Sequence, residues 1–157
     1  VAQAFIYENR IRQAASSLGA AQYCIDQAVA YARKRVTFGK PLATNQAIQF
    51  PLAELHTECE MVRGLVRRTA WHLDRHDHLE VSDLVSMANY RANRLVCNAA
   101  DQAIQVHGGV GYSRHYPFEH IYRHHRRYRI TEGSEEIQIR NVAGHLFGFM
   151  GKGRKAQ

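Results

Sequence analysis

Residues 14–32 read Ala-Ala-Ser-Ser-Leu-Gly-Ala-Ala-Gln-Tyr-Cys-Ile-Asp-Gln-Ala-Val-Ala-Tyr-Ala. Small or aliphatic residues recur there at spacings of three and four, the period of one helical face: Ala14, Leu18, Ala21, Ile25, Ala28 and Ala32. The alanines, serines and Gly19 allow a neighbouring helix to approach closely. Because no proline interrupts the pattern, we predict one long helix over residues 4–34.

A second helix is predicted over residues 45–75. Pro51 lies near its start, where proline is tolerated. Its apolar stripe comprises Ile48, Leu52, Leu55, Cys59, Val62, Val66 and Trp71. A tight loop punctuated by Gly39 and Pro41 separates it from the first helix.

A third helix is predicted over residues 82–105, with Ser82 or Asp83 as its N-cap. Its apolar stripe comprises Leu84, Met87, Ala88, Leu95, Ala99, Ala103 and Val106. Shorter helices are predicted over residues 118–128 and 134–147, and no segment alternates as a strand does. Three long and two shorter helices with short connections predict an all-α, up-and-down bundle over residues 1–149, followed by a basic, fraying tail at 150–157.

Length and composition limit the classes of protein to which this chain can belong. The chain has 157 residues, enough for one domain with its own core. No apolar run approaches the ~20 residues that cross a bilayer, and residues 1–5 do not resemble a secretory signal. Cys24, Cys59 and Cys97 are odd in number and widely spaced, which favours core thiols in a reducing compartment. Since the first residue is Val1, we expect a fragment or a processed product.

The formal net charge is +7, and much of it falls between Arg114 and Arg129. Such a surface suits nucleic acid, membrane headgroups or a phosphate-bearing cofactor. The segment also holds four histidines, but interleaved arginines would repel a metal ion and no acidic or cysteine partner stands at ligand spacing, so we predict no metal site. No nucleic-acid recognition motif accompanies the charge, and we predict no nucleic-acid partner.

Two motifs leave a structural and a functional interpretation open. Gln105-Val-His-Gly-Gly-Val-Gly-Tyr112 carries more glycine than a helix C-cap needs, and clustered backbone N–H groups favour anions. Residues 33–40, Arg-Lys-Arg-Val-Thr-Phe-Gly-Lys, are either a C-cap matched to the helix dipole or a means of presenting Arg35 to a phosphate and Phe38 to a ring.

The third motif is Arg129-Ile-Thr-Glu-Gly-Ser-Glu-Glu-Ile137. Ser134 is a good N-cap, and the acids after it suit the positive end of a helix dipole. Glu132 is therefore expected on an irregular joint between two helices. There it is either a solvated loop acid or a carboxylate that points into a cleft.

Together these motifs resemble the C-terminal helical domain of the acyl-CoA dehydrogenases, the FAD-dependent enzymes of fatty-acid and amino-acid oxidation. The resemblance covers nearly the whole chain and adds Arg-x-Thr-Phe-Gly-Lys-Pro-Leu at residues 35–42 and Pro-x-Glu-x-x-Tyr-Arg at 117–123. Family members also have an N-terminal helical domain and a middle β-domain, for which this chain has no room. We therefore expect it to be the C-terminal part of a longer enzyme, inactive by itself.

The resemblance implies the site residues. Glu132 matches the catalytic base that removes the α-proton of an acyl-CoA thioester while hydride leaves Cβ for flavin N5, giving a trans-2-enoyl-CoA. Arg10 and Gly133 match positions close to the substrate. The positions implied for FAD are Arg35, Thr37, Phe38 and Gln46, then Gln105, Val106, His107, Gly108 and Gly109, and finally Ser134 and Glu136. The first two groups would contact the FAD of a neighbouring subunit, so a homodimer or homotetramer is implied.

The sequence also departs from the family pattern. Members often have Tyr where Thr131 stands and Thr where Ser134 stands, and His124 and His125 replace a common Asp-Ala. These changes bear on acyl-chain specificity. Some relatives place the base just before the position of Arg10, but Asn9 occupies that place here, so Glu132 remains the expected base.

The implied partners are an acyl-CoA substrate and electron-transfer flavoprotein or a similar acceptor. The implied compartment is bacterial cytoplasm or mitochondrial matrix. Two alternatives remain: a non-catalytic helical oligomerisation domain, and a relative of the acyl-CoA oxidases, which pass electrons to oxygen. Replacing Glu132 with Gln separates catalysis from an assembly role.

Overall fold

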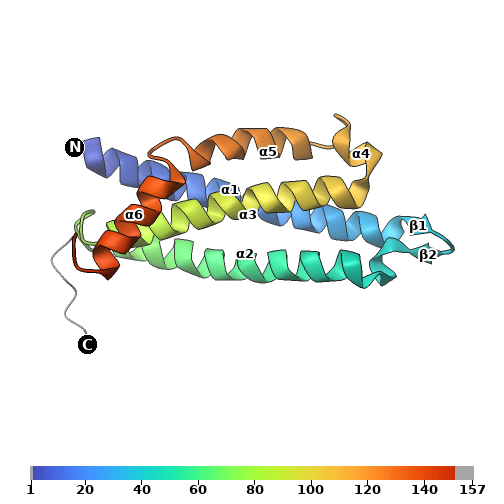
Figure 1. The fold of residues 1–157 in the computed structure, drawn as a ribbon, viewed down its shortest axis with the longest axis horizontal. Coiled ribbons are helices and arrows are strands. Elements are labelled where there is room, and N and C mark those ends of the chain that lie inside the picture. Colours follow the sequence, from blue (N-terminus) through green and yellow to red (C-terminus); the bar gives the residue numbers. More distant parts are fainter. Residues whose placement is uncertain (1, 151–157) are drawn as a thin grey trace.

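The structure, a computed structural model, describes the backbone of residues 2–150 and the side chains of residues 4–150. Three long helices lie side by side: α1 (Ala2–Lys34), α2 (Gln46–Leu73) and α3 (Ser82–His107). Each runs opposite to the one before it (Figure 1). The predicted all-α, up-and-down bundle is confirmed. The predicted tail falls almost entirely on residues 151–157, which lie outside the described residues.

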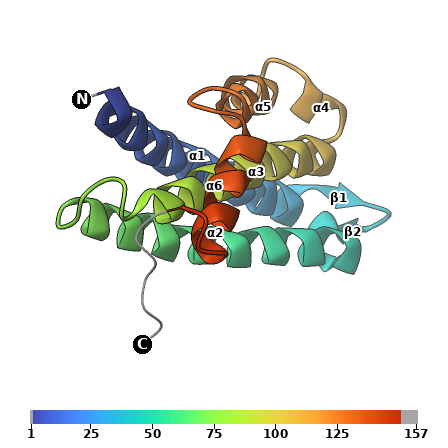
Figure 2. The same ribbon diagram turned by 60° about the vertical axis from the view of Figure 1, so that its left-hand side comes forward.

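The chain after α3 folds back over that helix. It forms α4 (Gly109–Tyr112), α5 (Phe118–Arg126), the 3₁₀ turn η2 (Arg127–Arg129) and α6 (Glu135–Leu146). Helices α5 and α6 both pack against α3, and α6 crosses over the first half of α3 (Figure 2). Helix α3 is thus the central element, and the joint between η2 and α6 is held above it.

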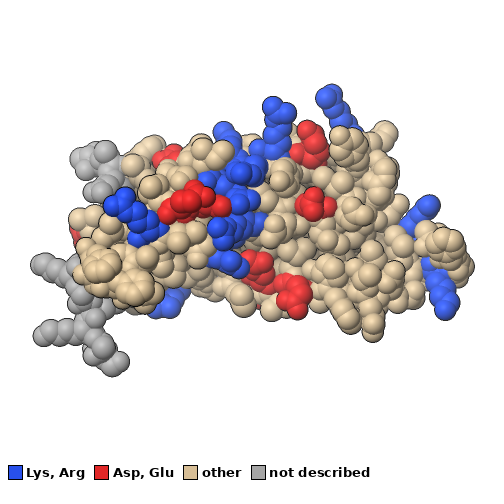
Figure 3. All heavy atoms as spheres, in the orientation of Figure 1, with Lys and Arg blue, Asp and Glu red and all other residues tan. Residues whose placement is uncertain are grey.

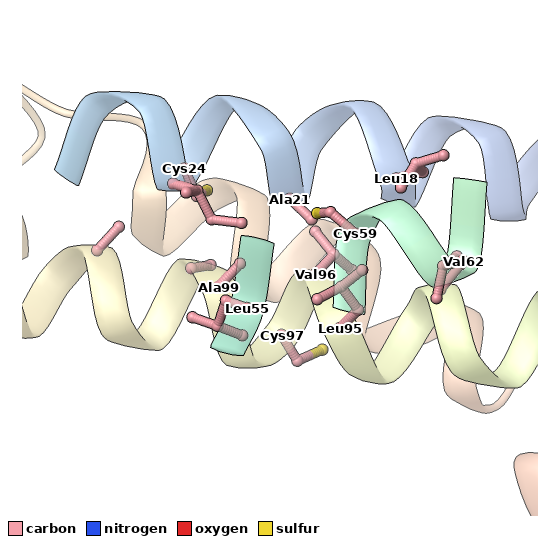
Figure 4. Packing of buried hydrophobic residues seen from close by; sticks show 14 of the residues in the cluster. Leu18, Ala21, Cys24, Leu55, Cys59, Val62, Leu95, Val96, Cys97 and Ala99 are labelled. Atoms are coloured by element: carbon pink, nitrogen blue, oxygen red, sulfur yellow. The ribbon is translucent and has the colours of Figure 1, made fainter. Parts of the chain in front are cut away.

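Small and aliphatic side chains fill the core between the three long helices. Ala21, Leu55 and Leu95 are buried there with all three cysteines, which are free thiols (Figure 4). Close packing of this kind makes each buried leucine worth about 1.5–3 kcal/mol of apolar transfer. Burial raises the pKa of the Cys24 thiol to about 12. The interpretation of the cysteines as small core residues is confirmed.

The predicted loop between the first two helices is a small hairpin. Strand β1 (Val36–Thr37) pairs antiparallel with β2 (Lys40–Pro41), and the 3₁₀ turn η1 (Leu42–Thr44) leads into α2. The two turn residues, Phe38 and Gly39, have φ of 49° and 78°. Positive φ at both positions suits the right-handed twist of a two-residue hairpin. Because phenylalanine is unusual at such a position, the sequence carries no clear hairpin signal.

Two details of the predicted helices are wrong. Trp71 is 51% exposed, because the buried face of α2 continues through Thr69, about 200° around the helix from Trp71. Val81 is the N-cap of α3, and the Ser82 hydroxyl donates to the carbonyl of Leu79. The predicted N-cap position of Ser134 on α6 is confirmed, although its side chain makes no capping hydrogen bond.

Candidate functional site

Glu132 lies on the joint between η2 and α6, as predicted. Its φ is 57° and that of Gly133 is 92°, so two consecutive residues have left-handed backbone. Among the described residues other than glycine, Phe38 and Glu132 alone have positive φ. This conformation costs a residue with a β-carbon about 1–2 kcal/mol. Such strain persists only where the surrounding structure imposes it.

Arg10 on α1 helps to hold Glu132 in this strained backbone conformation. Its Nε and Nη2 donate to the carbonyl oxygen of Glu132 at 2.9 and 2.6 Å. The Arg10 side chain is buried, and this burial lowers its pKa. A β-carbon on residue 133 would lie 2.9 Å from Arg10 Nη2, so glycine there permits the close approach of the guanidinium.

Gln138 and Asn89 support the joint through hydrogen bonds of their side chains. Gln138 Nε2 donates to the carbonyl of Gly133 and to Asn89 Oδ1, both at 2.9 Å. Asn89 Nδ2 donates in turn to the backbone carbonyl of Arg10 at 2.7 Å. Both amide side chains are fully buried, where an unpaired polar group costs about 1–3 kcal/mol. The network therefore ties α1, α3 and α6 to the backbone next to Glu132.

Asn93, one turn further along α3, extends the network. Its Nδ2 donates to Asn89 Oδ1 at 3.0 Å and to the carbonyl of Tyr128 at 3.1 Å, while its Oδ1 accepts from Ser17 at 2.7 Å. Both ends of the segment that carries Glu132 are thus anchored to α3. Nothing in the sequence indicates these roles, because polar side chains inside a helical stripe look the same whether they are buried or exposed.

Glu135, in the first turn of α6, is fixed by two arginines. Arg129 donates to its two carboxylate oxygens at 2.7 and 2.8 Å, and Arg94 on α3 donates to the same oxygens at 3.2 and 3.4 Å. Hydrogen bonds from Arg129 lower the Glu135 pKa to about 2. On the face drawn in Figure 3, basic side chains form a band across the bundle with acidic side chains beside it.

A cavity of about 450 Å³ opens beside Glu132. Its lining comes from α1, η2 and the joint: Asn9, Arg12, Gln13, Ser16, Arg127, Tyr128, Thr131 and Glu132. Asn9 Nδ2 donates to Glu132 Oε1 at 3.3 Å. The carboxylate is half-buried and borders the cavity, so it can meet a molecule that enters there. This geometry favours the interpretation in which Glu132 faces a cleft.

The hairpin and the glycine-rich segment lie together at the opposite end of the bundle from the start of α1 (Figure 1). Phe38, at the hairpin tip, is fully exposed, and Arg35, Gln105, Gly108 and Gly109 are also exposed. Arg10 on α1 and Arg35, the first residue after that helix, are separated by about 37 Å along the helix axis. Two separate candidate surfaces are therefore present, one at Glu132 and one at the hairpin.

Comparison with known proteins identifies this arrangement. The family model "Acyl-CoA dehydrogenase, C-terminal domain" matches residues 1–147. The chain belongs to the acyl-CoA dehydrogenase family. The resemblance and the fold expected from it are confirmed.

Among curated relatives, an acyl-CoA dehydrogenase of Bacillus subtilis is 39% identical, with 94% of this chain and 38% of the relative covered. The mitochondrial short-chain specific acyl-CoA dehydrogenase of Bos taurus is 41% identical, with 87% of this chain and 33% of the relative covered. The chain therefore spans little more than a third of their length.

Solved structures agree with this assignment. The complex of glutaryl-coenzyme A dehydrogenase with glutaryl-CoA has a TM-score of 0.90 at 31% identity, covering 99% of this chain and 39% of that one. Butyryl-CoA dehydrogenase from Megasphaera elsdenii has a TM-score of 0.86 at 32% identity, covering 93% and 38%.

Within this acyl-CoA dehydrogenase domain, Val106 and His107 face inward. His107 packs against the rings of Tyr31, Tyr116 and Phe118, with centroids 4.2–4.7 Å apart, and its Nδ1 donates to the carbonyl of Ala103. Burial lowers the His107 pKa, so the ring is neutral near pH 7. Any ligand contact from residues 106 and 107 must therefore come from the backbone.

The remaining predicted residues lie on or beside these two surfaces. Thr37 is half-buried in β1, and Gln46 is exposed at the start of α2, next to the hairpin. Ser134 and Glu136 stand beside Glu132 at the start of α6, where a hydrogen bond from Ser134 lowers the pKa of Glu136. Arg10 is not part of the cavity lining, because its guanidinium is engaged by the Glu132 carbonyl.

Two further observations concern partners. Across residues 2–150, no cluster of three or more potential metal-ligating side chains occurs. In the same part of the chain, none of the helices combines the length and apolar character needed to cross a membrane. The relatives include both bacterial and mitochondrial proteins.

Proposed function

We propose that this domain takes part in the FAD-dependent α,β-dehydrogenation of an acyl-CoA thioester, with Glu132 as the base that removes the α-proton. The observation that carries the proposal is the position of Glu132. Its backbone is held in a strained conformation by Arg10 and Gln138, and its carboxylate borders a cavity. A loop acid without a function has no need of such support.

The chain supplies the proton-transfer part of the reaction. A thioester whose α-carbon lies beside Glu132 gives its α-proton to the carboxylate, and the side chain of Asn9 donates to Oε1 and keeps the carboxylate oriented. Binding of the substrate displaces water from around the half-buried carboxylate and brings the α-proton within direct reach of it. A bound FAD would supply the hydride acceptor for the β-hydrogen, which is chemistry that no side chain offers.

The residues at the hairpin end fit FAD. Arg35 offers a positive charge and Phe38 an unhindered ring face, while the backbone around Gly108 and Gly109 is open: a β-carbon on either glycine would meet nothing within 4 Å. Exposed backbone N–H groups at a glycine-rich segment suit pyrophosphate. Thr37, Gln46 and Gln105 would complete this surface, with Val106 and His107 contributing backbone.

This surface and Glu132 would serve different FAD molecules. Because about 37 Å of α1 separates Arg35 from Arg10, a single extended FAD does not reach both ends. We infer that the hairpin end contacts the cofactor of a second copy, in a homodimer or homotetramer, whereas Ser134 and Glu136 contact the cofactor of their own subunit. Gly133 and the Glu132 backbone would face the thioester. Arg10 acts chiefly as a positioning residue, and its contact with the CoA arm remains a prediction.

An electron acceptor is also implied. One similar solved structure, 30% identical, is described as the electron transferring flavoprotein of Acidaminococcus fermentans, and a relative from Acetobacterium woodii is named as a subunit of a caffeyl-CoA reductase–Etf complex. We therefore propose electron-transfer flavoprotein as the acceptor. Bacterial cytoplasm or mitochondrial matrix is the proposed location.

The test uses the complete natural polypeptide that contains this chain, loaded with FAD. Glu132→Gln should abolish bleaching of the flavin by acyl-CoA while leaving FAD content and oligomeric state unchanged. Glu119→Gln, at an exposed acid on α5, is the matched control and should bleach normally. Unchanged bleaching in Glu132→Gln would support the assembly role instead. Reoxidation by oxygen as fast as by electron-transfer flavoprotein would support an oxidase.

A further inference from the structure

The cavity beside Glu132 has an unusual lining for an acyl chain. None of its eight lining residues is aliphatic: two are arginines, two are side-chain amides, and the rest are Ser16, Thr131, Tyr128 and Glu132. A hydrocarbon chain gains free energy by leaving water for apolar surroundings. This wall, by contrast, offers hydrogen-bond donors and positive charge.

The two arginines carry the inference. Arg12 on α1 and Arg127 in η2 are both exposed and both line the cavity. Within the described part of the chain, no ion pair joins either guanidinium to a carboxylate, whereas Arg63, Arg91, Arg94 and Arg129 are each paired with a glutamate. Guanidinium groups form strong, geometrically specific pairs with carboxylates. Within the described residues, the charge of these two guanidinium groups is therefore not paired and can be offered to a ligand.

Neutral neighbours orient both arginines. Arg12 Nη2 donates to Asn9 Oδ1. The guanidinium of Arg127 lies 5.0 Å from the Tyr128 ring centroid, and its Nη2 donates to His124 Nε2 at 3.4 Å. Burial and the neighbouring positive charges lower the pKa of His124, so this nitrogen can accept. A charge held in place loses less side-chain entropy on binding than a free one does.

We propose that Arg12 and Arg127 bind a carboxylate on the far end of the acyl group, so that the preferred substrates are CoA thioesters of dicarboxylic acids. This inference rests on the proposed function, because Glu132 fixes where the α-carbon lies. Glu132 and both arginines line the same cavity of about 450 Å³, so an acyl group whose α-carbon lies beside Glu132 has room to place its far end near the guanidinium groups. A phosphate of CoA is the other anion that the same thioester carries, and the experiment separates the two.

The experiment compares acyl groups of matched length in the complete FAD-loaded polypeptide. Succinyl-, glutaryl- and adipoyl-CoA are set against butyryl-, pentanoyl- and hexanoyl-CoA. The rate of flavin bleaching and, in the Glu132→Gln variant, the Kd from calorimetry are measured for each pair. We expect the dicarboxylic member of at least one pair to be preferred by about tenfold or more, as one charge-assisted contact allows.

Variants that remove one positive charge test which side chains cause the preference for dicarboxylic thioesters. Arg12→Gln and Arg127→Gln should each lower the preference about tenfold. Arg127→Gln should have little effect on the monocarboxylic thioesters, whereas Arg12→Gln should slow both classes as well, because Arg12 also donates to Asn9, which orients Glu132. Arg123→Gln is the matched control, because Arg123 is an exposed arginine of α5 outside the cavity lining. It should leave the preference unchanged.

The remaining outcomes overturn the inference. Equal or better use of monocarboxylic thioesters in every pair would do so. An equal loss for both classes in Arg127→Gln would do so too, because it would place a CoA phosphate at that arginine. If no thioester bleaches the flavin, the proposed function fails. The calorimetric preference for the dicarboxylic thioesters then decides separately whether the arginines bind the carboxylate.

Discussion

The guanidinium of Arg10 donates two hydrogen bonds to the carbonyl oxygen of Glu132, at 2.9 and 2.6 Å, across 122 residues of sequence. The contact joins the first long helix to the joint before the last one. It acts on the backbone of Glu132, so it leaves the carboxylate free while fixing the direction in which it points.

Arg10→Lys should therefore slow flavin reduction without removing FAD. Lysine keeps the charge but cannot form the two-pronged contact. A base displaced by about 1 Å can cost up to about 100-fold in rate, so we expect a fall of roughly 10- to 100-fold in the bleaching rate with less than about a threefold change in KM. Arg68→Lys, at an exposed position on α2, is the control. If Arg10→Lys and Arg68→Lys changed kcat by the same amount and the Tm by the same amount, Arg10 would not be a positioning residue.

Glu132→Asn should make the protein inactive yet no less stable. Asparagine tolerates left-handed backbone better than glutamate does, and φ of 57° costs glutamate about 1 kcal/mol here. The lost side-chain contact is a single hydrogen bond of 3.3 Å to Asn9. We expect the Tm to be unchanged or to rise by about 2–4 °C.

The matched control is Glu54→Asn, at an exposed position inside α2. Asparagine is the poorer helix former there, so the Tm should fall slightly. A fall in Tm of the same size in Glu132→Asn would show that the positive φ carries no strain.

The helical bundle was predictable because its stripes are long and regular. Leu52, Cys59 and Val62 on α2 and Leu84, Leu95 and Ala103 on α3 are buried as the period requires. The sequence did not predict the hairpin at Phe38, because strands of two residues are too short to show an alternation of apolar and polar side chains. The end of the stripe at Trp71 was missed because a polar residue, Thr69, occupies its last buried position.

The candidate site was predictable only in part. The prediction that Glu132 lies on a joint between two helices followed from the neighbouring Gly133 and Ser134, which are local signals in the sequence. Its supports did not follow, because Asn89 and Gln138 are 49 residues apart and neither stands in a recognisable motif. The cavity wall formed by Arg12 and Arg127 likewise depends on how α1 meets η2, which no local pattern encodes.

Glu135 should make the stability of the protein fall in acid. Its pKa is depressed to about 2 by Arg129 and Arg94, whereas an unfolded glutamate titrates at about 4.3. The contribution is fully present above the unfolded pKa and is lost as the pH falls from about 4.5 to 2, and it amounts to about 2–3 kcal/mol. Its measurement is the free energy of unfolding by urea at several pH values.

Glu135→Gln should flatten that pH dependence and lower stability at pH 7. Glu119→Gln is the control, because Glu119 is exposed and its side chain makes no ion pair in the described part of the chain. If the two variants have the same slope between pH 4.5 and 2, then Glu135 does not carry the acid sensitivity.

Gly111 should resist substitution because α4 packs directly on the last turn of α3. A β-carbon there would lie 2.6 Å from His107 Cβ and 2.8 Å from the carbonyl oxygen of Ile104. Neither atom belongs to a flexible side-chain end, so Gly111→Ala must push α4 away from α3. We expect a loss of about 2 kcal/mol or more in unfolding free energy, as for other overpacked sites.

Gly64→Ala gives the contrast. Gly64 is exposed inside α2, and a β-carbon there would meet nothing within 4 Å. Alanine should stabilise that helix by about 1 kcal/mol, because it loses less backbone entropy on folding than glycine does. The same chemical change thus has opposite signs at the two positions. If Gly111→Ala were also neutral or stabilising, α4 would not be fixed against α3, and the glycine-rich segment would not form a rigid edge for a cofactor.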